Sequence, residues 1–232
     1  MPLSDVLLSN RSAEPVYPGI WSTLPADQRV DGYDRMAKAY DRVVGNGLYN
    51  RLVWGASVQN YADGARVGLR DAGGGPILDC GCGSLVFTAK PYQSAPLDRM
   101  ILFDRSLGMM QRGAARLPGG QFLQGDAFDL PFRDGAFETV FAWGFLHVVG
   151  TKSPLLAELR RVAAPDATVT LSSLVLTNRA IGNRMLGLLH RQGEAATPET
   201  EAEVTRAFSD TFTLASQTLY GSMLVLQGTA RG

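Results

Sequence analysis

Short apolar runs alternate with stretches of helical periodicity through the middle of the chain. After the Gly73-Gly74-Gly75-Pro76 turn, each apolar run is bounded by turn-forming residues, which is typical of a buried strand. The predicted strands cover residues 77–80, 100–104, 121–124, 139–143 and 167–174. Apolar residues three and four positions apart predict helices over residues 85–92, 106–116 and 153–162. This alternation predicts a doubly wound α/β fold, in which helices cover both faces of a mostly parallel sheet.

The N-terminal part of the chain has two different patterns. Residues 1–30 carry four prolines among polar residues, so we expect an irregular arm. Residues 31–72 contain no proline, and their apolar spacing predicts two cap helices separated near Gly45-Asn46-Gly47. Because the composition does not change further on, residues 31–232 are predicted to form a single domain.

Two further segments follow the predicted cofactor-binding core, which spans residues 76–174. A helical pattern and then a Glu-rich stretch predict a lid over residues 178–203. Residues 205–232 contain two strand-like runs, 211–219 and 222–229, which predict a C-terminal antiparallel hairpin. With the five core strands, the hairpin gives a Rossmann-like sheet of seven strands.

The composition indicates which kinds of molecule the protein binds. The 232 residues are 45% apolar and 19% charged, as in a globular protein with a sizeable core. Lysine and arginine together number 22, as do aspartate and glutamate, so the chain carries no basic footprint for nucleic acid. We therefore expect a small-molecule partner and no nucleic acid, and we leave a homodimer open.

The chain is also poor in residues that form disulfides and metal sites. Its two cysteines, Cys80 and Cys82, are too close in sequence to meet disulfide geometry readily. With two histidines, His147 and His190, remote from them, we expect no metal site. The sequence has no signal-peptide pattern and no run near the ~20 apolar residues of a spanning helix, so we expect no integral membrane association and a cytoplasmic location.

The first predicted strand runs into a glycine-bearing turn. The segment reads Ile77-Leu78-Asp79-Cys80-Gly81-Cys82-Gly83-Ser84. Gly81 and Gly83 allow unusual dihedral angles and a close approach of the backbone to a ligand. Open α/β sheets bind their ligands at the carboxyl ends of the strands, where this turn lies. Alone the turn is weak evidence, because glycine turns after strands are common for structural reasons.

Three acids at the ends of successive predicted strands indicate an adenosine site. Asp79 and Asp104 end the first two strands, and Asp126 follows the third. A carboxylate at Asp104 can accept both hydroxyls of a ribose, and Asp126 can accept an exocyclic amine such as that of adenine. Val86 stands where a dinucleotide fingerprint needs glycine, which disfavours a nicotinamide-dependent reductase. The glycine turn is also not followed by the Lys-Ser or Lys-Thr pair of a phosphate loop. A phosphate-free adenosine ligand with an amino group fits S-adenosylmethionine.

Seven blocks between Tyr33 and Leu174 resemble the class I S-adenosylmethionine-dependent methyltransferases. Within that class they are most similar to the ubiquinone and menaquinone biosynthesis C-methyltransferases. The blocks are Tyr33-Asp34-x-Met36-Ala37-x-x-Tyr40-Asp41, Leu78-Asp79-Cys80-Gly81-Cys82-Gly83, Asp104-Arg105-Ser106-x-x-Met109-Met110, Gly125-Asp126-Ala127-x-x-Leu130-Pro131-Phe132, Phe137-Glu138-Thr139-Val140, His147-Val148 and Glu158-Leu159-Arg160-Arg161-Val162.

The resemblance implies S-adenosylmethionine as the cofactor and assigns roles to residues at the strand ends. The residues implied to contact the cofactor are Tyr40, Asp79, Gly81, Cys82, Gly83, Asp104, Arg105, Met109, Asp126, Ala127 and Trp143. Those predicted to border the acceptor are Tyr33, Trp143 and His147. Tyr33 has the alternative of anchoring its own helix, and Trp143 that of an ordinary core residue.

Three positions depart from the family pattern. The third glycine of the first motif is Leu85, the usual Pro-Gly after the last helix is Pro165-Asp166, and the acid near the fourth strand is Glu138. Leu85 matters most, because its side chain could crowd the methionine part of the cofactor. It keeps open the alternative of a catalytically silent S-adenosylmethionine-binding relative with a regulatory or assembly role.

The predicted reaction is methyl transfer to a small-molecule acceptor, at carbon or oxygen. An in-line displacement at a sulfonium depends mainly on the alignment of nucleophile, methyl group and sulfur. A base is needed only if the acceptor must lose a proton, and His147 is the candidate for that role. The alternative for His147 is a histidine that packs and hydrogen-bonds locally.

Overall fold

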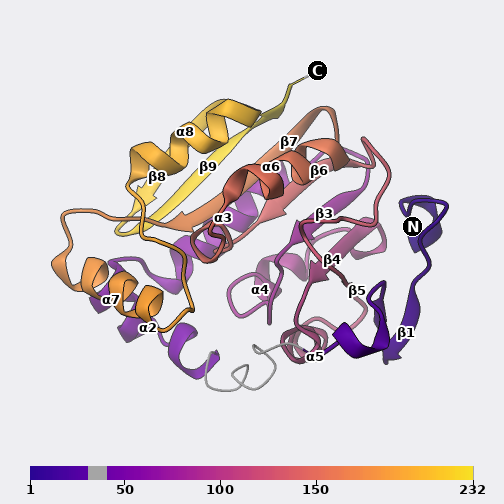
Figure 1. Ribbon diagram of the computed structural model, residues 1–232, viewed down its shortest axis with the longest axis horizontal. Helices are drawn as coiled ribbons and strands as arrows, with labels where there is room; N and C mark the ends of the chain where they lie inside the picture. The colour runs from indigo at the N-terminus through magenta and orange to yellow at the C-terminus, as the bar shows by residue number, and fades with distance from the viewer. Residues whose placement is uncertain (31–40, 232) are drawn as a thin grey trace.

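A single nine-stranded sheet organises the protein in the computed structural model, which describes residues 1–30 and 41–231 (Figure 1). Its strands lie in the order β1-β2-β5-β4-β3-β6-β7-β9-β8. Their bounds are Glu14–Tyr17 (β1), Ile20–Ser22 (β2), Ile77–Cys80 (β3), Met100–Asp104 (β4), Gln121–Gln124 (β5), Phe137–Ala142 (β6), Ala163–Leu174 (β7), Phe212–Tyr220 (β8) and Met223–Ala230 (β9). The strands from β2 to β7 are parallel, and β9 is antiparallel to both β7 and β8, which confirms the mostly parallel sheet and the C-terminal hairpin.

Helices cover both faces of the sheet, as predicted. Their bounds are Gly47–Tyr49 (α2), Val58–Arg70 (α3), Ala89–Tyr92 (α4), Leu107–Arg116 (α5), Lys152–Val162 (α6), Ala180–Arg191 (α7) and Glu201–Thr211 (α8), with a π-helical segment over Asn50–Trp54. On one face, α6 and α8 pack together and bury Leu159 and Phe208 (Figure 1). On the other, α3, α4 and α5 bury Ala65, Tyr92 and Met110.

The N-terminal arm departs from the prediction of an irregular segment. Two short strands of the arm, β1 and β2, extend the sheet, so it has nine strands where seven were predicted. Ile20 is fully buried and pairs in parallel register with Phe122 of β5. Pro15 lies in β1 at the edge of the sheet, where a missing N–H costs no ladder hydrogen bond. The prolines therefore exclude a helix but not an edge strand.

Helix α8 is a second departure, because no helix was predicted between the end of the lid at residue 203 and the start of the hairpin strand at residue 211. Thr200 caps this helix in a reciprocal capping box with Glu203, whose side chain accepts from the Thr200 backbone N–H at 2.7 Å. The Thr-x-x-Glu spacing was a readable start signal. The preceding helix α7 agrees with the prediction, whereas α4 is shorter than predicted because residues 82–88 form a turn.

None of the helices in the described ranges is both long and apolar enough to cross a bilayer.

Candidate functional site

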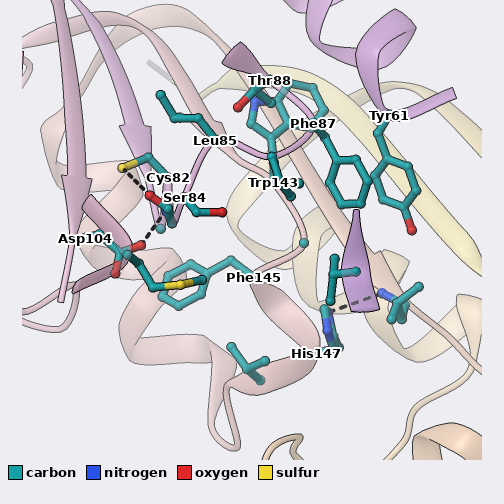
Figure 2. Close-up of a pocket in the computed structure, with 18 of the residues that line it drawn as sticks. Tyr61, Cys82, Ser84, Leu85, Phe87, Thr88, Asp104, Trp143, Phe145 and His147 are labelled. Atoms are coloured by element: carbon teal, nitrogen blue, oxygen red, sulfur yellow. Dashed lines mark hydrogen bonds between the residues drawn. The ribbon is translucent and has the colours of Figure 1, made fainter. Parts of the chain in front are cut away.

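A cavity of about 470 Å³ lies at the carboxyl edge of β3, β4 and β6. One wall is the glycine-bearing turn from Gly81 to Thr88, and another is the segment from Phe103 to Met109. Figure 2 shows Asp104 on the side of this turn and His147 on the opposite side of the drawn residues. The position agrees with the ligand site expected for an open α/β sheet.

The glycine turn is held against β4 by its backbone. The N–H groups of Gly81 and Cys82 both donate to the Phe103 carbonyl, at 2.8 and 3.0 Å. Gly81 and Gly83 have φ values of 78° and 55°, which a side chain disfavours. The two glycines differ in surroundings, since a Cβ at Gly81 would lie 2.8 Å from the Phe145 ring, whereas one at Gly83 would meet only Met109 Cε at 3.7 Å.

This difference makes a matched pair of alanine variants informative. Gly83→Ala is expected to lower the free energy of unfolding by about 1 kcal/mol, the cost of a left-handed alanine. Gly81→Ala is expected to cost about 2 kcal/mol, because the Phe145 ring must also move. Urea denaturation of both variants measures the order, and equal losses would contradict the predicted contact with Phe145.

Asp104 lies at the end of β4 and lines the cavity, and its predicted contact with the ribose stays a prediction. Its Oδ2 accepts from the Gly83 N–H at 2.7 Å, and its Oδ1 accepts from the Ser106 N–H at 2.9 Å. The carboxylate therefore ties the glycine turn to the start of α5. Arg105, Met109 and the next strand end, at Ala127, line the same part of the cavity.

Asp126 does not join this lining. Its Oδ1 accepts from the Phe128 N–H at 2.9 Å, and its Oδ2 lies 3.9 Å from Arg105 Nη1. About half of the Asp126 side chain is exposed. The predicted contact of its carboxylate with adenine stays a prediction.

Leu85, which stands in place of the third glycine of the motif, keeps the glycine-like backbone with φ 56°. Its side chain is buried and packs in the core with Phe122 and Met110. Its Cγ lies 3.4 Å from where a Cβ at Gly113 of α5 would be. The side chain therefore packs in the core, but Leu85 is also among the residues that line the cavity, and its predicted effect on the methionine part stays a prediction.

Asp79 lies one layer behind the cavity and is fully buried. Its Oδ2 accepts from the Tyr92 hydroxyl at 2.9 Å, and that hydroxyl accepts from Trp143 Nε1 at 2.9 Å. Its Oδ1 has no hydrogen-bond partner within the described ranges. Burial raises the pKa of Asp79 to about 7, although the Tyr92 hydroxyl opposes that rise. The chain of three side chains connects the strand end to Trp143, which lines the cavity.

A charged cluster behind the turn was not predicted. Asp41 is almost fully buried and accepts from the Ser84 hydroxyl, from Arg112 Nε and, at 2.6 Å, from Arg116 Nη2. Arg116 Nη1 also donates to the Ser84 carbonyl at 2.6 Å. Arg112 and Arg116 are one helical turn apart on α5, and that spacing was the only signal in the sequence. We call these residues the Asp41 cluster.

The far side of the cavity is apolar, and of its residues only Trp143 was predicted to border the acceptor. Tyr61 and Phe87 stack with ring centroids 4.1 Å apart and an angle of 9° between their planes (Figure 2). The other apolar residues on this side are Trp54, Trp143, Leu189 and Met223. We call this group the apolar wall. Its members come from α3, the glycine turn, the π-helical segment, β9 and the predicted lid, so sequence spacing alone could not join them.

The remaining predicted residues divide in two. Gly81, Cys82, Gly83 and His147 line the cavity, and their predicted contacts with cofactor or acceptor stay predictions. Tyr33 and Tyr40 lie outside the described residues, so their predicted roles stay predictions. Cys80 and Cys82 are buried free thiols, and burial raises the pKa of both well above the usual range.

Comparison with known proteins agrees with this geometry. Residues 78–171 match the methyltransferase domain family. The chain is 35% identical over 96 residues to a demethylmenaquinone methyltransferase of Renibacterium salmoninarum, and this match spans 40% of that relative. It is 28% identical over 196 residues to a protein of the same name from Mycobacterium tuberculosis, covering 80% of this chain and 79% of the relative.

Solved structures share the fold at low sequence identity. The [4+2]-cyclase SpnF superposes with a TM-score of 0.67 at 15% identity, covering 86% of this chain and 93% of that one. The magnesium protoporphyrin IX methyltransferase of Synechocystis, solved with bound S-adenosylhomocysteine, gives a TM-score of 0.63 at 20% identity, covering 86% and 96%. The fold alone therefore does not fix the reaction.

The fold, the strand-end site and the domain match over residues 78–171 are similar to those of the class I S-adenosylmethionine-dependent methyltransferases. Within this class its similarity is to the quinone C-methyltransferase branch. The cofactor of the site is S-adenosylmethionine. The residues present fit it, because the Gly81–Gly83 cradle, the Asp104 carboxylate and Ala127 border one continuous cavity.

Proposed function

We propose that this protein transfers a methyl group from S-adenosylmethionine to a small, partly apolar acceptor at carbon or oxygen. The observation that carries the proposal is the single cavity that joins the glycine turn and Asp104 to the apolar wall. When bound, the cofactor supplies an electrophilic methyl group. The protein's part is to hold the acceptor in line with that group and to exclude water.

Residues at one end of the cavity would bind the cofactor, and those at the other end would bind the acceptor. The Gly81–Gly83 turn would hold the methionine part, and Asp104 would accept the ribose hydroxyls. The apolar wall would bury the body of the acceptor, because its stacked rings favour a flat apolar surface. Trp143 borders the cavity, and the hydrogen bond from its Nε1–H to the Tyr92 hydroxyl orients its ring.

The test begins with binding and ends with transfer. Titration calorimetry with S-adenosylmethionine and S-adenosylhomocysteine measures the cofactor site directly. Transfer of a labelled methyl group is then measured with oxidised and with reduced demethylmenaquinone, which the names of the relatives suggest as first probes. Absence of binding at millimolar concentrations would overturn the proposal at its first step.

Asp104 provides a quantitative check of the cofactor site. Asp104→Ala is expected to weaken S-adenosylhomocysteine binding by about 1–3 kcal/mol, because the ribose hydroxyls lose a charged acceptor. Asp104→Asn is the matched control, since it keeps the size of the side chain and removes the charge. Calorimetry that gives the wild-type affinity for Asp104→Ala would show that the ribose lies elsewhere.

The alternative is a cofactor-binding relative without turnover. Leu85 suggests this alternative, because it borders the cavity although its side chain packs in the core. One experiment distinguishes the active methyltransferase from the silent relative. The silent relative is expected to bind S-adenosylhomocysteine but to transfer no labelled methyl group to any acceptor in a panel of phenols and quinols.

A further inference from the structure

His147 carries the single imidazole among the described residues that line the cavity. The hydrogen bond that fixes this ring comes from the backbone N–H of Leu174, which donates to Nδ1 at 3.4 Å (Figure 2). Leu174 ends β7 and pairs in antiparallel register with Met223 of β9, so the sheet holds the donor in place. The orientation of the imidazole is therefore set by the backbone.

This contact determines which ring nitrogen carries hydrogen. A backbone N–H can only donate, so Nδ1 of His147 must accept and cannot carry a proton. A neutral imidazole has one N–H, which is then on Nε2. Nε2 has no hydrogen-bond partner within residues 1–30 and 41–231. It is not among the fully buried polar atoms that lack a partner, so it is accessible from the cavity. It is the polar atom that His147 offers to the cavity.

We propose that His147 donates a hydrogen bond from Nε2–H to an oxygen of the methyl acceptor and does not remove the acceptor's proton. The inference rests on the proposed function, because it assumes that the acceptor enters this cavity. It gives the acceptor a chemical requirement, an oxygen with an available lone pair such as that of a carbonyl, an ether or a hydroxyl. An acceptor without such an oxygen would leave the N–H unsatisfied beside the apolar wall.

The electrostatics agree with a neutral ring. Burial lowers the pKa of His147 to about 4, and the positive charge of Lys152 on α6 lowers it further. Lys152 itself pairs with Glu199 of the predicted lid. A ring whose conjugate acid is this strong is a weak base at neutral pH, whereas its donor capacity is unaffected.

The tautomer can be measured in the free protein. Long-range proton–nitrogen NMR spectra at mildly alkaline pH distinguish a protonated from a bare ring nitrogen, and this chain has two histidines. We expect a protonated Nε2 and a bare Nδ1 for His147. His190 is the internal control, because its Nδ1 lies 3.2 Å from the Ala195 carbonyl, which can only accept. The two rings should therefore show opposite tautomers, and His190→Gln assigns the signals.

Two substitutions test the role toward the acceptor. His147→Gln keeps an N–H donor near the Nε2 position but cannot act as a base, and His147→Leu removes both. With labelled S-adenosylmethionine and reduced demethylmenaquinone, we expect His147→Gln to stay within about threefold of the wild-type KM, and His147→Leu to raise KM about tenfold. S-adenosylhomocysteine affinity should be unchanged in both variants, which shows that they are folded.

The outcomes separate the inference from the proposed function. An Nδ1–H tautomer, or an equal fall in kcat in both variants, would overturn the donor role of His147 and favour a base. Absence of methyl transfer by the wild-type protein with every acceptor would overturn the proposed function instead. The tautomer measurement needs neither cofactor nor acceptor, so it decides the state of the ring in either case.

Discussion

Asp79→Asn is expected to make the protein more stable than the wild type at pH 8 but not at pH 4. Asp79 is fully buried, and burial raises its pKa to about 7 from an ordinary value of 3.8. The folded protein therefore binds this proton more tightly than the unfolded chain does. The contribution of Asp79 to stability is complete below about pH 4 and is lost as the pH rises through 7.

The size of the effect follows from the shift. At about 1.4 kcal/mol per pKa unit, ionising Asp79 costs the folded state up to about 4 kcal/mol above pH 7. Asparagine keeps an oxygen that accepts from the Tyr92 hydroxyl and never ionises. The difference in free energy of unfolding between variant and wild type should grow by up to about 4 kcal/mol from pH 4 to pH 8.

Urea denaturation at a series of pH values measures this difference. A difference that does not change with pH would show that Asp79 ionises normally in the folded protein. Repeating the series with saturating S-adenosylhomocysteine tests the predicted role toward the methionine part. If the ligand's ammonium group pairs with Asp79, the ligand lowers the pKa of the carboxyl and the wild type recovers stability at pH 8.

The parallel core could be predicted because each of its strands is buried on both faces. Continuous apolar runs such as 100–104, bounded by turns and separated by helices, are typical of buried parallel strands. Because neighbouring parallel strands end at the same edge of the sheet, Asp79 and Asp104 lie at one edge. The arm strands could not be predicted in this way. β2 is three residues long, and its burial depends on a parallel partner, β5, that is remote in sequence.

Most of the apolar wall was not predicted, for a related reason. Trp54, Tyr61 and Met223 belong to segments that meet only when the sheet is complete, so no local pattern joins them. The position of the Asp126 side chain, in contrast, depends on its neighbours in sequence. Its carboxylate closes a turn on the Phe128 N–H, and aspartate does this readily, so a strand-end position alone did not decide between turn and ligand.

Asp41→Ala is expected to lower the free energy of unfolding by about 3 kcal/mol at neutral pH. The substitution removes the acceptor of Ser84, Arg112 and Arg116 together and leaves two guanidinium groups facing each other. Loss of one partner from a buried ion pair costs about 3–5 kcal/mol, and the lower figure applies because the two arginine side chains are about one-third exposed. Ser84→Ala, which removes only the hydroxyl, should cost about 1 kcal/mol.

The pH dependence of the Asp41 cluster has the opposite sign to that of Asp79. Burial alone would raise the pKa of Asp41, but hydrogen bonds from Ser84, Arg116 and Arg112 outweigh it and lower the pKa below 3.8. This stabilisation is present above the ordinary pKa and is lost as the pH falls through the lowered value. Urea denaturation of Asp41→Asn should therefore show a loss that shrinks in acid.

The Asp41 cluster also connects stability to the cofactor site. Ser84 directly follows Gly83, and Arg116 holds its carbonyl, so releasing Asp41 frees one end of the glycine turn. We expect Asp41→Asn to weaken S-adenosylhomocysteine binding about tenfold, through the cost of ordering the turn on binding. Arg112→Ala in the same background should weaken binding little further, because the pair is already broken. Additive losses in this double-mutant cycle would show that the arginine acts independently of Asp41.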